Sequence, residues 1–189
     1  MRRFLLSAMV LVFLTSNICY AQSAKEAVTV LQQLRSKCQA GISYPAYGPA
    51  VGDAKFEVDL FLEGKEAKEK PEIAESVHKA MDFYEEAKRL AMLTFGYEIW
   101  GGERGFIRIG AEPRESDTNE RLSIESARQW NRVNERINSM VSPVLKRHPE
   151  IKVEVKGANY KLVYVPDLVN AVWNDASKEL DKAMKLLSQ

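Results

Sequence analysis

The segment ESVHKAMD, which begins at Glu75, contains the residue types of a metal site. Glu75 and His78 are three residues apart and Asp82 follows four residues later, so on a helix all three would project from one side. Zn²⁺ and Cu²⁺ accept such carboxylate and imidazole ligands. A di-iron site needs two E-x-x-H pairs, and the only other histidine, His148, precedes a proline. The segment leaves open one Zn or Cu site, but it favours an exposed histidine among charged neighbours.

A glycine-rich segment, GYEIWGGERGFIRIG at 96–110, resembles a phosphate-binding loop only in its glycines. A P-loop needs a Lys followed by Ser or Thr at the start of a helix, and a dinucleotide loop also leads into a helix. Here the extended run FIRIG follows the glycines. The segment therefore predicts a glycine turn, with Glu103 and Arg104 at a solvated tip. If the segment is functional, we expect it to act as the rim of an interface.

Arginine is concentrated in one part of the chain, since eight of the ten arginines beyond residue 21 lie between 103 and 148. Four of them, Arg121, Arg128, Arg132 and Arg136, recur at helical spacing beside an apolar face. With nine basic and seven acidic residues in this window, the simpler interpretation is a solvated face with Glu–Arg pairs. The functional alternative is a surface that binds an acidic protein or an anionic envelope polymer.

Aromatic residues suggest a second candidate surface. Tyr44 and Tyr47 stand in the segment ISYPAYGP, which we expect to be a loop because of its prolines and glycine. Together with Trp100 they could form an aromatic ligand patch. The alternative is that aromatic residues on separate elements each anchor one element in the core.

Signatures of nucleophilic catalysis and of covalent haem are absent from the sequence, which contains neither G-x-S-x-G nor C-x-x-C-H. Cys38 lies on the apolar stripe of its expected helix, which favours a buried small hydrophobe over an intermolecular disulfide. The sequence thus identifies no cofactor, which stays unknown. Because it also lacks these catalytic signatures, we expect a protein that is not an enzyme.

The first 21 residues have the pattern of a secretory signal peptide. Arg2 and Arg3 precede an apolar run, and Cys19-Tyr20-Ala21 supplies small residues at the expected cleavage site. The apolar run is shorter than the roughly 20 residues that a membrane-spanning helix needs. We therefore expect cleavage after Ala21, export to the periplasm or the medium, and no transmembrane segment in the mature chain.

The mature chain, 22–189, is long enough for one domain with a sizeable core. Without Arg2 and Arg3 it has 25 basic and 26 acidic residues, and this near-neutral charge argues against nucleic-acid binding.

The pattern of apolar residues predicts the helices and strands that would position these residues. It predicts helices that begin at Ser23, Pro49, Pro71, Ser116 or Asp117, and Pro166, with Pro143 kinking or restarting the fourth. Alternation predicts a hairpin at 151–165 and strands at Tyr97–Trp100 and Phe106–Ile109.

The fold class is therefore mainly α, a single bundle of four to five helices with one or two small β-hairpins. We expect a binding or accessory module that acts through its surface. The alternative is a metal- or cofactor-binding helical bundle.

Overall fold

The structure, a computed structural model, describes residues 23–97, 105–109, 124–156 and 160–189. In chain order the elements are α2 (Ala24–Gln39), α3 (Tyr44–Glu63), α4 (Lys65–Glu69), α5 (Pro71–Tyr97), β1 (Phe106–Ile109), α6 (Ile124–Arg147), β2 (Val153–Lys156), β3 (Tyr160–Tyr164) and α7 (Val165–Leu187). The fold is mainly α with a small antiparallel sheet, which confirms the predicted fold class. No helix within these ranges is long and apolar enough to cross a bilayer.

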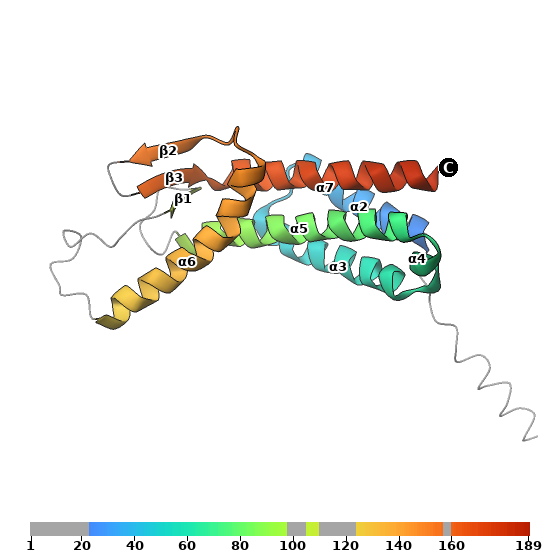
Figure 1. The fold of residues 1–189 in the computed structure, drawn as a ribbon, viewed down its shortest axis with the longest axis horizontal. Helices are drawn as coiled ribbons and strands as arrows, with labels where there is room; N and C mark the ends of the chain where they lie inside the picture. Colours follow the sequence, from blue (N-terminus) through green and yellow to red (C-terminus); the bar gives the residue numbers. More distant parts are fainter. Residues whose placement is uncertain (1–22, 98–104, 110–123, 157–159) are drawn as a thin grey trace, which may run out of the picture.

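Four helices, α2, α3, α5 and α7, form an antiparallel bundle (Figure 1). One hydrophobic cluster fills it and takes buried side chains from every helix, such as Leu31, Val58, Tyr84 and Val172. Burial of each large apolar side chain contributes about 1.5–3 kcal/mol before the entropy of ordering it is subtracted. The bundle is therefore held mainly by the apolar stripes that the sequence shows.

Local signals set the beginning of α2 where the sequence predicts it. Ser23 accepts a hydrogen bond from the backbone N–H of Glu26, whose carboxylate accepts one from the backbone N–H of Ser23. After α2 the chain turns at Gly41, which has φ +82°. Cys38 is buried, as predicted, and burial raises the pKa of its thiol to about 12.

The predicted loop at Tyr44–Tyr47 is wrong, because α3 begins at Tyr44 rather than at Pro49. Pro45 has the φ that the first turn requires, whereas Pro49, inside the helix, has no N–H for the carbonyl of Pro45 and its ring crowds that carbonyl. The Tyr47 side chain is fully buried, and its hydroxyl donates to the Tyr84 carbonyl at 2.9 Å. Tertiary contacts therefore extend the helix by one turn through a sequence that locally favours a loop.

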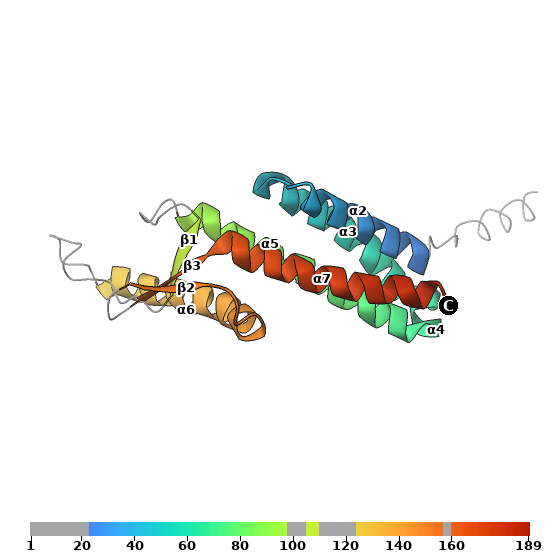
Figure 2. The same ribbon diagram turned by 90° about the horizontal axis from the view of Figure 1, so that it is seen from above.

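α6 crosses beside the sheet and packs its buried residues Ile137, Val141 and Val144 into the core (Figure 2). The helix is continuous through Pro143, so it does not restart there. Pro143 and Ser139 are both exposed, so water can satisfy the Ser139 carbonyl that has no N–H partner at Pro143. The predicted start of this helix near Ser116 or Asp117 lies outside the described residues.

The three strands form one antiparallel sheet in the order β1-β3-β2 at the end of the bundle away from the C-terminus (Figure 1). β2 and β3 are the predicted hairpin. The predicted strand at Tyr97–Trp100 is wrong at Tyr97, which ends α5, and residues 98–100 are not described. The other predicted strand is β1, and it pairs with β3.

Candidate interaction surface

The sheet presents two different faces, and the bundle covers one of them. Ile107 and Val163 are paired across β1 and β3, and both side chains are fully buried in the core. On the opposite face Phe106 is paired with Tyr164, and their rings lie 5.0 Å apart at 43°. Aromatic pairs of this kind contribute about 0.5–1.5 kcal/mol beyond their burial. The sheet therefore positions an aromatic pair on the face opposite Ile107 and Val163, where β3 leads into α7.

Gly105 lets the backbone pass directly beside the Tyr164 ring of this pair. It has φ +80°, and a Cβ at this position would lie 2.7 Å from the ring of Tyr164. Its carbonyl accepts a hydrogen bond of 2.8 Å from Val165 N–H. The last glycine of the GGERG segment is therefore part of a turn, as predicted, while the tip at Glu103 and Arg104 lies outside the described residues.

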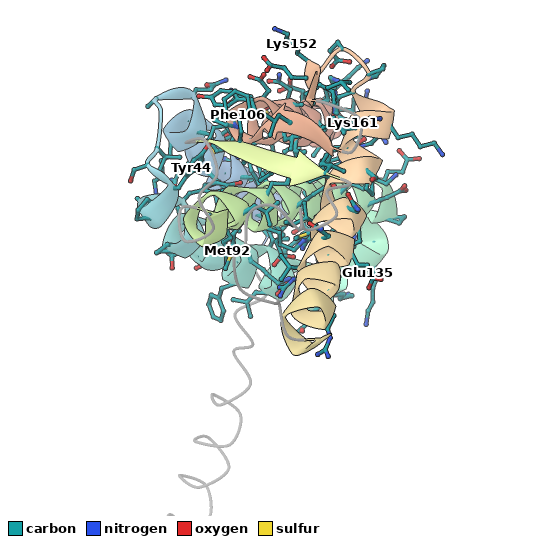
Figure 3. All side chains as sticks on the ribbon, turned by 90° about the vertical axis from the view of Figure 1, so that its left-hand side faces the viewer. Tyr44, Met92, Phe106, Glu135, Lys152 and Lys161 are labelled. Carbon is teal, nitrogen blue, oxygen red and sulfur yellow. The ribbon has the colours of Figure 1, made fainter. Side chains whose placement is uncertain are left out.

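Tyr44 belongs to the same aromatic group, although it comes from α3. Its side chain is half-buried, and burial together with the neighbouring Tyr164 phenol raises the pKa of Tyr44. Figure 3 looks onto this end and shows Tyr44 near the start of β1. Tyr44 is therefore half-buried beside Tyr164, and its predicted role in an interaction surface stays a prediction.

Tyr47 does not belong to the surface, and its predicted role there is wrong. Its ring packs edge-on against Trp173 with centroids 5.2 Å apart, inside the bundle. Burial raises the pKa of its phenol, so the hydroxyl stays a neutral donor to Tyr84. Trp100, the third residue of the predicted patch, is not described.

Large exposed hydrophobic side chains occur in the sheet and on two helices. Among the described residues they are Phe56, Met92, Val155 and Tyr164, with exposed fractions of 63%, 62%, 69% and 38%. Met92 lies near the end of α5 in the view of Figure 3, and Val155 and Tyr164 belong to the sheet. Phe56 lies in the middle of α3. By the strand register Val155 shares a face with the buried Val163, whereas Tyr164 is on the opposite face, so these side chains lie around the sheet and do not form one contiguous patch. Exposed apolar side chains around one element can still mark an interaction site.

Basic side chains accompany these hydrophobic residues. Arg132 and Arg136 are exposed on α6, and Lys152 and Lys161 are exposed beside and within the sheet (Figure 3). The side chains of Arg121 and Arg128 lie outside the described residues, so their part of the predicted stripe stays a prediction. We call Met92, Val155 and Tyr164, with these four described basic residues, the sheet-end surface.

The three residues of the predicted metal site lie on α5, where their side chains pair with one another or with a neighbouring charged residue of the same helix. The Glu75 carboxylate pairs with Lys79, and Nδ1 of His78 lies 3.5 Å from the carboxylate of Asp82. All three side chains are exposed, and no cluster of three or more His, Cys, Asp and Glu side chains with metal-binding geometry occurs in the part of the chain that the structure describes. A metal at this place stays a prediction.

The exposure of Val155 does not follow from the sequence. Val155 belongs to the apolar alternation of its strand, which predicts burial, whereas Met92 lies outside the apolar stripe of its helix, four residues after Lys88. Val155 lies on the same strand face as Val153, but two residues farther from the core. Val153 pairs with the buried Val163 and is half-buried, whereas Val155 pairs with the exposed Lys161.

Comparisons of the chain with protein-family models, with curated proteins and with solved structures found no significant match. The function therefore has to be inferred from the chain's own residues.

Proposed function

We propose that the protein is an exported, non-enzymatic binding or accessory module of the periplasm or the medium, and that it binds a protein partner through the sheet-end surface. The signal-peptide pattern of residues 1–21 supports export. The observation that carries the choice of surface is the exposure of Val155 and Tyr164 on the two faces of the sheet, with Met92 near the end of α5 (Figure 3).

A protein partner fits the chemistry of this surface better than a small molecule does. Met and Tyr are enriched in protein interfaces, where apolar contacts form the centre and polar residues the rim. Arg132 and Arg136 on α6, with Lys152 and Lys161, would form a basic rim. An acidic rim on the partner would complement it and speed association.

Affinity capture tests the proposal. The tagged mature chain is incubated with envelope extract, and captured proteins are quantified by mass spectrometry. We expect Met92→Ser combined with Val155→Ser to reduce capture of the partner about tenfold or more, because truncation of central apolar contacts costs on the order of 2 kcal/mol. Phe56→Ser is the matched control, since it removes an equally exposed hydrophobic side chain from a different part of the surface.

The same variants distinguish a protein from a polymer. Arg132→Glu with Arg136→Glu is expected to weaken capture less than the apolar pair does, because charges at a rim contribute little affinity. If purified envelope polymer binds, loses binding with the arginine variant and keeps it with the serine variant, the partner is an anionic polymer and the proposal is overturned. Equal capture of one partner by the serine variant and the Phe56 control would also overturn it.

A further inference from the structure

His148 occupies the joint between α6 and β2. It follows the last residue of α6, and its backbone N–H donates to the Val144 carbonyl at 2.8 Å. It is one of two buried polar residues in the described part of the chain, with 10% of its side chain exposed. The carbonyl end of a helix attracts positive charge, so this position favours a protonated histidine.

Both ring nitrogens of His148 face carboxylates. Nε2 lies 2.7 Å from Oδ2 of Asp175 on α7, and Nδ1 lies 3.0 Å from Oε1 of Glu150. A neutral imidazole carries one N–H, and its other nitrogen is an acceptor that would face a carboxylate oxygen unfavourably. Both contacts are hydrogen bonds only when the ring is doubly protonated. The geometry therefore favours the imidazolium form, more through Asp175, which is 14% exposed, than through Glu150, which is 70% exposed.

Charged groups from three helices surround this pair of bonds. Asp175 also lies 3.6 Å from Nε of Arg147 on α6 and 3.3 Å from Nζ of Lys178 on α7. Arg147 pairs with Glu86 of α5 and lies over the Phe83 ring, 5.4 Å from its centroid. When His148 is protonated, the three cations balance the three anions. The cations are His148, Arg147 and Lys178, and the anions are Asp175, Glu150 and Glu86. Loss of the proton leaves one negative charge in excess, beside an Asp175 side chain that is only 14% exposed.

We propose that protonation of His148 is a pH-sensitive latch that holds the C-terminal end of α6, and the β2 segment after it, against α7. Among the α6 residues whose side chains the structure describes, the buried ones, Ile137, Val141 and Val144, lie toward this end, while the helix axis extends away from the bundle at its other end (Figure 1). The His148 contact at the α6–β2 connection therefore affects how firmly the end of α6 and the β2 segment pack against α7. The latch does not depend on which partner the sheet-end surface binds.

The direction of the pH response follows from the same contacts. Burial disfavours the charged ring, but the hydrogen bonds to Asp175 and Glu150 outweigh burial, so the pKa of His148 lies above its ordinary value of 6.5. Because the proton is bound more tightly in the folded chain, the stabilisation is complete below about pH 6.5. It is lost as the pH rises through the folded-state pKa.

Hydrogen exchange of the wild type and a His148→Gln variant tests the latch. Comparison at one pH cancels the intrinsic pH dependence of exchange. At about pH 5.5 we expect amides of residues 141–156 to exchange about tenfold faster in the variant, the order expected for losing a hydrogen bond to a charged group. At a pH above the folded-state midpoint of His148, which a histidine titration locates, the two proteins are expected to converge. His78→Gln, exposed on α5, is the control and should match the wild type at both values.

A ratio of the same size at both pH values would overturn the latch, because the contact would then be structural and independent of the proton. A second measurement applies even if His148→Gln does not fold. His78→Gln leaves one histidine in the chain, whose ring resonances report the titration of His148 directly. We expect a midpoint above 6.5 that falls when Asp175→Asn is added. A midpoint at or below the ordinary histidine value would also overturn the proposal.

Discussion

At the scale of single residues, Gly105 meets two independent requirements for glycine. Its φ of +80° is unfavourable for any residue with a Cβ, and that Cβ would contact the Tyr164 ring at 2.7 Å. Gly105→Ala is expected to lower the free energy of unfolding by about 1–3 kcal/mol. Gly52→Ala is the matched control, since Gly52 is exposed within α3 with open space around it. There alanine should raise stability by roughly 0.5–1 kcal/mol. Chemical denaturation of both variants measures the difference, and equal effects would contradict the reasoning.

At the scale of elements, the first turn of α3 depends on a distant hydrogen bond. Tyr47 donates to the carbonyl of Tyr84, 37 residues away, from inside the core. Tyr47→Phe keeps the ring against Trp173 but removes the donor, and we expect a loss of about 1 kcal/mol. Tyr164→Phe, at the exposed aromatic pair, should change stability by less than about 0.5 kcal/mol. Thermal unfolding followed by circular dichroism compares the two variants. A larger loss in Tyr164→Phe would mean that the sheet, rather than α3, depends on a tyrosine hydroxyl.

The same elements show what sequence reasoning can and cannot reach. The start of α2 and the burial of Cys38 were predictable because a capping box and an apolar stripe are both local. The start of α3 was not, because the contact that offsets its proline is with α5. Of the sheet-end surface, Arg132 and Arg136 are candidates that the sequence offers, while the exposure of Val155 contradicts the burial that its alternation predicts. The His148–Asp175 contact joins residues 27 positions apart and leaves no periodic signal.

At the scale of the whole molecule, the sheet and the bundle share one hydrophobic cluster, and Ile107 of β1 is fully buried within it. This continuity predicts that both parts unfold together. Ile107→Ala should lower the free energy of unfolding by about 2–5 kcal/mol, because it leaves a cavity in the shared core. Val155→Ala, on an exposed site of the same sheet, should change it by less than about 0.5 kcal/mol.

Circular dichroism reports the helices, and fluorescence of a probe attached at Lys161→Cys reports the sheet. Coincident transitions in both variants would establish one cooperative unit. If the probe's transition alone shifts in Ile107→Ala, the sheet unfolds independently of the bundle, and the sheet-end surface can open while the four helices stay folded.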